Sequence, residues 1–149
     1  MPRESFLATL RELARCFQAF ESHSAAHIRT LGLTPPQFDI VATLGNTAGM
    51  SFKELGEKTL ITKGTLTGVV DRLEARGIVR RVGSDADRRS TRVELTDAGA
   101  ALFDEVFPGV VARTKQVFDM LGESERLTLE ASLRRLREAF ESFSEEGSK

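Results

Sequence analysis

The sequence predicts a mainly α-helical fold with a small β-hairpin. Apolar residues recur every three or four positions over most of the 149 residues, which is the period of one face of an α-helix. Between residues 78 and 95 the pattern changes to alternation on both sides of a turn-forming segment, which indicates two paired strands. Capping and glycine signals separate these segments, so their order along the chain is also predicted.

The composition is that of a globular protein. Hydrophobic residues make up 40% and charged residues 29%, which argues against a disordered or collagen-like chain. No apolar run reaches the roughly 18 residues that a bilayer span needs, and residues 1–10 lack the apolar stretch of a signal peptide. The single cysteine excludes an internal disulfide. We therefore expect a cytoplasmic protein without a membrane partner.

The net charge of −1 is unevenly distributed. Residues 51–95 hold ten Lys/Arg and seven Asp/Glu, a net charge of +3, whereas the rest of the chain has a net charge of −4. Because a basic segment in an acidic protein localises contact with a polyanion, this segment is the candidate nucleic-acid region. A solvated, arginine-rich hairpin explains the charge pattern equally well.

The first two predicted helices precede this basic segment. Residues 5–29 carry one apolar face, and Gly32 closes the helix. A second helix begins at Thr34, because Thr34 and Gln37 have the spacing of a capping box with proline in the first turn.

Two shorter helices begin the basic segment. Ser51 and Glu54 form a second capping-box pattern, so a short helix is expected over 51–58. The next helix is predicted over 62–76, with Thr62 as its cap and Gly77 in the usual position after the last turn. Strands are expected at 78–82 and 91–95 on either side of the turn residues 83–87.

The remainder of the chain is predicted to be helical. Thr96 and Asp97 start a helix that Pro108-Gly109 should kink or break, and Gly122 marks the next boundary. The last helix carries an apolar seam at steps of four and three, which is typical of helix–helix association. The seam consists of Leu129, Leu133, Leu136, Phe140 and Phe143.

Two helices joined by a short turn and followed by strand–turn–strand is the order of a winged helix-turn-helix, whose second helix enters the major groove. The outward residues at the start of that helix suit phosphates and base edges: Thr62, Lys63, Thr65 and Thr67. Gly64 and Gly68 each cost about 1 kcal/mol relative to alanine in a helix. They either let the backbone approach DNA closely or are simply tolerated.

The hairpin tip contains Asp87, Arg88 and Arg89. An arginine at such a tip can enter a narrow minor groove, where the potential is most negative, and Asp87 can hold a neighbouring arginine in place. An exposed ion pair worth under about 1 kcal/mol is the alternative.

Residues 34–102 resemble the winged-helix core of the MarR family of bacterial transcriptional regulators. The matching stretches are LTPPQF (33–38), VDRLEARG (70–77), DRRS (87–90) and LTDAG (95–99). Gly56 and Thr59 depart from the usual helix-turn-helix pattern of alanine and an aliphatic residue.

The resemblance implies a homodimer that reads a pseudo-palindromic operator. It places Lys63, Thr65 and Thr67 in the major groove, Arg72 near phosphate, and Arg89 in the minor groove, oriented by Asp87. It also implies a DNA-binding region over 33–97 and a helical dimerisation region over 1–32 and 98–149. The apolar residues expected in the dimer interface are Leu7, Leu10, Leu129, Leu133, Leu136 and Phe140. Packing of the two terminal helices within one chain is the alternative.

Some members of this family sense peroxides through a cysteine of the first helix, where Cys16 lies. Arg15 favours a low thiol pKa, but the tyrosines that support the thiolate in those members are absent here. A cysteine packed in the helix is the competing interpretation.

His23 and His27 share one helix face, with a spacing that suits zinc, but no further histidine or nearby cysteine completes a site, and no metal is predicted. By resemblance, a small ligand binds between the dimerisation region and the winged helix. The candidate pocket residues are Phe20, His23, His27 and Phe38.

The sequence therefore predicts a DNA-binding transcriptional repressor that a small aromatic or phenolic ligand releases from its operator. The alternatives are a winged-helix protein-interaction module and a redox regulator acting through Cys16. The chain carries no phosphate-binding glycine loop, serine elbow or complete metal motif, so neither an enzyme nor a cofactor is expected.

Overall fold

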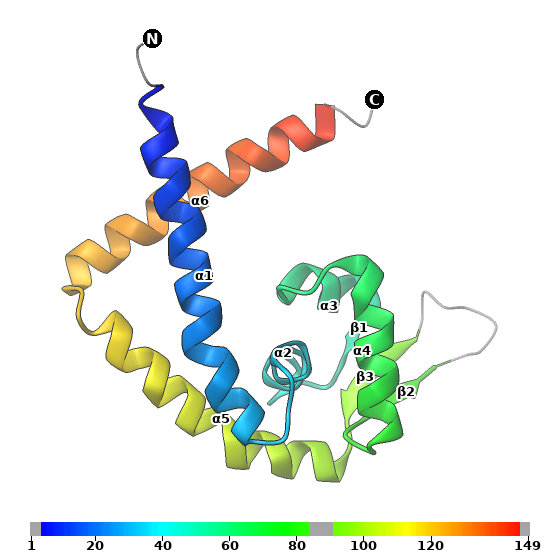
Figure 1. Cartoon of the computed structure of the whole chain (residues 1–149). Helices are drawn as coiled ribbons and strands as arrows, with labels where there is room; N and C mark the ends of the chain where they lie inside the picture. Colours follow the sequence, from blue (N-terminus) through cyan, green and yellow to red (C-terminus); the bar gives the residue numbers. More distant parts are fainter. Residues whose placement is uncertain (1–3, 84–90, 147–149) are drawn as a thin grey trace. The chain divides into compact units, whose positions relative to one another are not determined.

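The computed structural model describes residues 4–83 and 91–146, and it confirms a mainly α-helical fold with a small sheet (Figure 1). The elements are α1 (Phe6–Thr30), α2 (Pro35–Leu44), β1 (Met50–Ser51), α3 (Phe52–Lys58), α4 (Lys63–Ala75), β2 (Val79–Val82), β3 (Arg92–Leu95), α5 (Asp97–Phe118) and α6 (Glu123–Glu146). The chain divides into two compact units, one that ends at Val110 and one that begins at Val111. None of the described helices is long and apolar enough to cross a membrane.

Both predicted capping boxes are present. The Thr34 hydroxyl accepts from the Gln37 amide at 3.3 Å, and the Gln37 side chain accepts from the Thr34 amide at 3.1 Å. Ser51 and Glu54 make the same reciprocal pair at the start of α3. These contacts satisfy amides that have no partner within the helix, so α2 and α3 begin at the predicted residues.

The end of α4 is set by Gly77, whose φ of 73° lies in the left-handed region that favours glycine. The Gly77 amide donates to the Glu74 carbonyl at 2.9 Å, and the Ile78 amide donates to the Leu73 carbonyl at 3.0 Å. This is a Schellman motif, and the buried side chains of Ile78 and Leu73 provide its apolar contact. The chain is thereby turned directly from α4 into β2.

The sheet has the order β1-β3-β2 and is antiparallel throughout. Val79 pairs with Leu95 across the predicted hairpin, and Met50 pairs with Val93. Strand β1 was not predicted, because two residues next to a capping box carry no alternating pattern. It pairs with β3, so β3 is the central strand of a three-stranded sheet.

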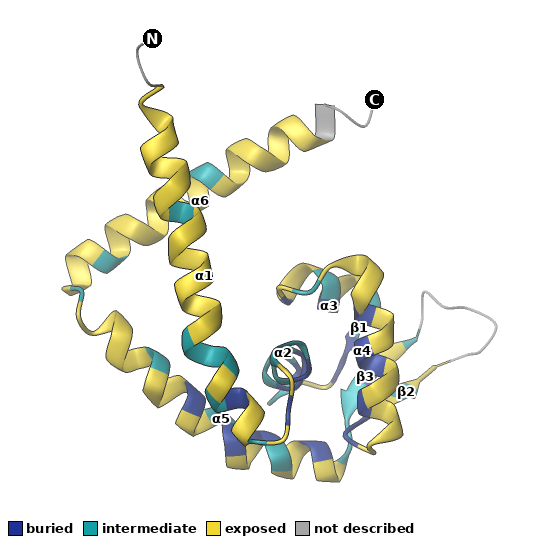
Figure 2. Cartoon of the chain, in the orientation of Figure 1, coloured by how far each residue is buried: buried dark blue, intermediate teal, exposed yellow. Residues whose placement is uncertain are grey.

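The hydrophobic core joins α2, α3, α4 and the sheet (Figure 2). Ile28 from the end of α1 belongs to the same buried cluster, and so do Phe103, Val106 and Val110 from the first half of α5. The residues with the least exposed side chains are Ile40, Val41, Leu44, Leu55, Val70, Leu73, Val79 and Val93. This cluster fixes α4 against the sheet. We call α2, α3, α4 and the sheet the winged core.

The side-chain cap expected at Thr62 and a break at Pro108 are both absent. Thr62 occupies the cap position of α4, but its hydroxyl bonds the Thr65 hydroxyl at 2.9 Å and makes no cap bond to the backbone. Of the kink or break expected at Pro108, the break does not occur, because α5 is one helix from Asp97 to Phe118. Proline costs about 3 kcal/mol inside a helix, and burial of the α5 side chains on either side, Val106 and Val110, offsets that cost.

Candidate nucleic-acid interface

Helices α3 and α4 form the predicted helix-turn-helix, and α2 holds the turn between them. The carboxylate of Asp39 accepts from the Leu60 amide at 2.8 Å. Burial raises the pKa of Asp39, and the hydrogen bond from Leu60 opposes this rise. Sequence reasoning missed this contact, because 21 residues separate its partners and a single aspartate on a helix gives no signal.

Thr59 explains one departure from the usual helix-turn-helix pattern. Its side chain is buried at the end of α3, where an aliphatic residue is the usual choice. The hydroxyl donates to the Leu55 carbonyl at 2.6 Å, so the buried polar group is satisfied. Threonine therefore fills the aliphatic position without an unpaired hydroxyl.

The start of α4 presents the predicted contact residues to solvent. Thr62, Lys63, Thr65 and Thr67 are all exposed, whereas Leu66 faces the core. A Cβ added at Gly64 or Gly68 would meet nothing within 4 Å. Packing within the chain therefore does not require these two glycines.

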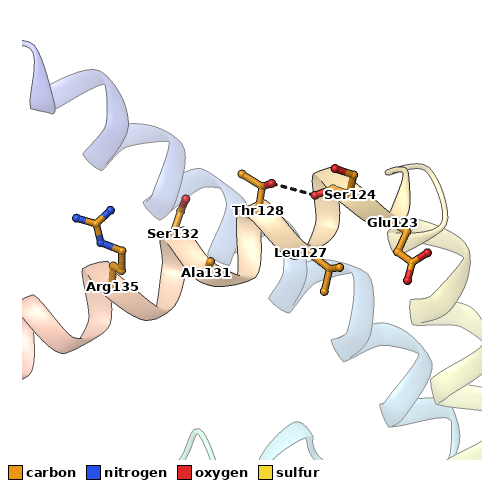
Figure 3. A pocket seen from close by; sticks show the side chains of 7 residues that line it. All are labelled: Glu123, Ser124, Leu127, Thr128, Ala131, Ser132 and Arg135. Carbon is orange, nitrogen blue, oxygen red and sulfur yellow. Dashed lines mark hydrogen bonds between the residues drawn. The ribbon is translucent and has the colours of Figure 1, made fainter.

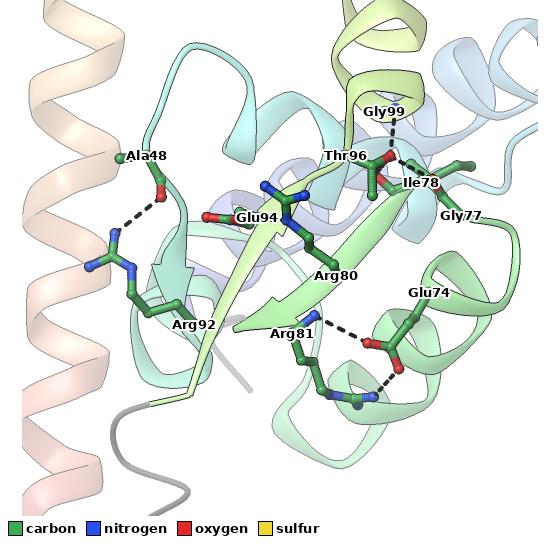
Figure 4. Close-up of polar contacts among 10 residues, drawn as sticks. All are labelled: Ala48, Glu74, Gly77, Ile78, Arg80, Arg81, Arg92, Glu94, Thr96 and Gly99. Atoms are coloured by element: carbon green, nitrogen blue, oxygen red, sulfur yellow. Dashed lines mark hydrogen bonds and ion pairs between the residues drawn. The ribbon is translucent and has the colours of Figure 1, made fainter. Parts of the chain in front are cut away.

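The arginines of the basic segment do not form one uniform surface (Figure 4). Arg80 bonds the Glu94 carboxylate at 2.6 Å, Arg92 donates to the Gly49 carbonyl at 2.7 Å, and Arg76 donates to the Gly32 carbonyl at 3.0 Å. Arg81 bonds Glu74 and Asp71 of α4. Carboxylates compensate the charges of Arg80 and Arg81, whereas the carbonyls that Arg76 and Arg92 bond are neutral. Counting charges along the sequence therefore overestimated the free positive charge at Arg80 and Arg81.

Two basic residues of α4 stand apart from this group. Lys63 and Arg72 are exposed and make no ion pair within residues 4–83 and 91–146. Asp87, Arg88 and Arg89 lie outside the described residues, so their roles at the hairpin tip stay predictions. On the described surface, Lys63 and Arg72 are the predicted contact residues with uncompensated charge.

The predicted pocket residues lie on two helices that pack against each other. His23 and His27 are half-buried on α1, and Phe38 of α2 packs against the core, whereas Phe20 is exposed. The Nε2 atom of His23 is buried and has no hydrogen-bond partner among the described residues. A buried polar atom without a partner favours a bound group or water at this position.

Two other features bear on ligands. No group of three metal-ligating side chains occurs within the described part of the chain, and Cys16 is an exposed free thiol.

A hollow of about 590 Å³ runs along α6, lined by Glu123, Ser124, Leu127, Thr128, Ala131, Ser132 and Arg135 (Figure 3). Because one helix cannot enclose a ligand, we do not assign the effector to this hollow.

The predicted dimer residues are accessible on the single chain. All lie on α1 and α6, and the exposed ones are Leu7, Leu10, Leu129, Leu133 and Phe140. Leu136 is half-buried. Single exposed apolar residues are ordinary, but a periodic row of them is typical of an interface.

Comparison with known proteins gives consistent relatives. A family model described as MarR family matches residues 31–90. The transcriptional regulator MhqR of Bacillus subtilis is 31% identical over 113 residues, which are 76% of this chain and 78% of that protein. The transcriptional repressor MdtR of the same organism is 29% identical, over 77% of this chain and 74% of that one.

A solved structure has the same fold over nearly the whole chain. It shows BpsR of Bordetella bronchiseptica, whose DNA binding is regulated by 6-hydroxynicotinic acid. The TM-score is 0.78 at 28% identity, and the match covers 92% of this chain and 98% of that chain.

Proposed function

Because the chain belongs to the MarR family of transcriptional regulators, we propose that it is a repressor that binds a pseudo-palindromic operator as a homodimer. A small aromatic acid releases it. The observation that carries the proposal is the exposed face of α4, where Lys63 in the first turn and Arg72 in the last turn have uncompensated charge. Transcriptional regulators of this family are not enzymes, and the proposal needs no cofactor.

DNA contact in this proposal begins at α4. Lys63, Thr65 and Thr67 face the major groove, and Arg72 meets a phosphate. Gly64 and Gly68 leave space for the duplex to approach the helix backbone, since none of the described residues comes within 4 Å of a Cβ built at either position. Arg88 and Arg89 act in the minor groove with Asp87 as the orienting carboxylate, and R89A should weaken binding by about 1–3 kcal/mol.

The dimer in this proposal uses the apolar rows of α1 and α6. Two copies place two recognition helices on successive major grooves, about 34 Å apart. Occlusion of a promoter by such a dimer is sufficient for repression. A ligand that favours another spacing of the two helices then releases the DNA, because it binds the released form more tightly.

Lys63 provides the main test. K63A should lower affinity for a labelled duplex from upstream of the protein's own gene and reduce the slope of log K against log salt by about one unit. R113A, which removes an exposed charge of α5 outside the winged core, is the matched control and should leave the slope unchanged. Absence of any duplex binding by the parent protein would instead favour the protein-interaction module.

The ligand class is tested separately with 6-hydroxynicotinate, the regulator of the related BpsR. Calorimetry should detect binding to the parent protein and a weaker interaction with H23A, because the ligand would bond the unpartnered Nε2 of His23. S22A, on the exposed neighbour in α1, is the control. Cyclohexanecarboxylate keeps the carboxylate on a saturated, non-aromatic ring, and equal binding of that compound would contradict an aromatic pocket.

A further inference from the structure

Arg81 of β2 is surrounded by groups from two helices. Its guanidinium donates to the Glu74 carboxylate at 2.9 Å and also bonds the Asp71 carboxylate. Its backbone amide donates to the other oxygen of Glu74 at 3.2 Å (Figure 4). The guanidinium carbon lies 5.5 Å from the centre of the Phe52 ring of α3, within the range of a cation–π contact. One side chain therefore joins β2 to both helices of the helix-turn-helix.

The electrostatics of this cluster differ from those of a phosphate contact. Asp71 and Glu74 are three positions apart, so they share one face of α4 and both reach the same guanidinium. The hydrogen bond with Asp71, reinforced by Glu74, raises the pKa of Arg81. A guanidinium with two carboxylate partners offers little free charge to DNA. Arg72, which lies on α4 beside those carboxylates in sequence, has no such partner among the described residues.

We propose that Arg81 is a positioning residue, which fixes the wing strand β2 against the recognition helix α4 and strengthens operator binding without contacting the duplex. This inference rests on the proposed DNA-binding function. Arg81 is the penultimate residue of β2, which ends at Val82 before the connection to β3. Its bonds to α4 thus restrain the strand close to the hairpin tip, whereas the turn at Gly77 restrains only the opposite end.

The two carboxylates allow a test that distinguishes a phosphate-binding role of Arg81 from a positioning role. The two roles predict opposite changes in operator affinity when the carboxylates are neutralised. If Arg81 binds phosphate, D71N/E74Q frees its charge and removes two negative charges near DNA, so operator affinity should rise. If Arg81 is a positioning residue, the same double variant releases β2 and affinity should fall. E57Q/E105Q removes two exposed carboxylates from α3 and α5 and is the matched control for net charge.

The experiment measures binding of the full-length dimer to the upstream duplex over a range of salt concentrations. We expect D71N/E74Q and R81M each to bind about tenfold more weakly than the parent with an unchanged salt slope, and the triple variant to bind no more weakly than either. We expect E57Q/E105Q to bind as tightly as the parent or more tightly. R81K is the second variant in case R81M fails to fold, because it keeps the charge but cannot bridge both carboxylates.

Tighter binding by D71N/E74Q, parent-like binding by R81K, or a slope reduced by about one unit in R81M would each overturn the positioning role. Hydrogen exchange of the Arg81 amide separates this failure from failure of the proposed function, because it needs no DNA. The amide should exchange at least tenfold faster in E74A, which removes its acceptor, than in E57Q/E105Q. If the amide exchanges faster as expected but the parent protein binds no duplex, the contact between β2 and α4 is supported. The role of that contact in DNA binding is then rejected.

Discussion

The winged core and the C-terminal helix α6 differ in how far their apolar side chains are buried. In the winged core, the side chains of Ile40, Leu55 and Leu73 are completely buried. Helix α6 has an apolar seam of similar size, yet Phe140 is 58% exposed and Phe143 is 76% exposed. No residue of α6 whose side chain is described is buried.

The difference shows which part of the molecule can be stable by itself. The winged core buries its apolar surface within one chain, at about 1.5–3 kcal/mol for each large side chain. Helix α6 is supported by exposed ion pairs, such as Glu130 with Arg134 at 2.9 Å, which are worth only about 0.3–0.5 kcal/mol each. These ion pairs do not cover the apolar seam, so we expect a second copy of the chain to cover it.

The largest effect is expected from a charge placed in that seam. L133D should convert the dimer to monomers, because a symmetric interface loses the residue twice and with it about 3–6 kcal/mol. Sedimentation at low micromolar concentration measures the change. E141A, on the ion-paired face of α6, should stay dimeric. A dimer of undiminished stability in L133D would remove α6 from the interface.

The same truncation in the two regions sharpens the comparison. L73A should lower the free energy of unfolding of the winged core by about 2–5 kcal/mol. The truncation removes buried apolar atoms and leaves a cavity in the core. L127A, at an exposed position of α6 outside the seam, should change the free energy of unfolding by less than about 0.5 kcal/mol. Urea unfolding provides both values, and losses of equal size would contradict the division into a buried core and an exposed helix.

Two glycines of α5 test how closely that helix packs against the winged core. A Cβ at Gly99 would lie 2.0 Å from the Ile78 carbonyl oxygen, and that backbone atom cannot move aside. G99A should therefore destabilise the protein by about 1–3 kcal/mol. G109A meets nothing within 4 Å and should stabilise the helix by about 0.5–1 kcal/mol. Thermal unfolding should shift in opposite directions for the two variants, and a common direction would reject this packing.

The smallest effect is expected from the buried carboxyl of Asp39. Because burial raises its folded-state pKa above the ordinary value of 3.8, the folded state holds the proton more tightly than the unfolded state. The free energy of unfolding should therefore fall as pH rises from the ordinary pKa to the raised one. D39N keeps the acceptor for Leu60 and should lack this fall. Urea titrations between pH 4 and 7 test it, and parallel curves for the parent and D39N would contradict it.

Much of the fold could be predicted because its signals are local. The capping boxes at Thr34 and Ser51 and the glycine after α4 depend on residues a few positions apart, and all three lie where the sequence placed them. Strand β1 escaped prediction because two residues have no period. The break considered at Pro108 does not occur, since the penalty of proline is local and the burial that offsets it is not.

The candidate site was predicted only in part, and Arg81 shows why. In the sequence, Arg81 was only one of the charges of the basic segment 51–95, whereas the resemblance to the MarR family placed Arg72 near phosphate. The structure pairs Arg81 with two carboxylates and leaves Arg72 exposed. Asp71, Glu74 and Arg81 are close enough in sequence to be noticed, but nothing in their spacing shows that β2 folds back over that face of α4.

The sequence by itself determined the helices, the hairpin and the order in which they follow one another, because hydrophobic period, caps and turn residues act over one or two turns. Tertiary structure alone decided which charges are free and which polar groups are satisfied. The Asp39–Leu60 bond spans 21 residues and the Arg76–Gly32 bond spans 44. Such pairs form only after hydrophobic burial has brought the elements together, and their free energy depends on distances of a few ångströms that no local pattern encodes.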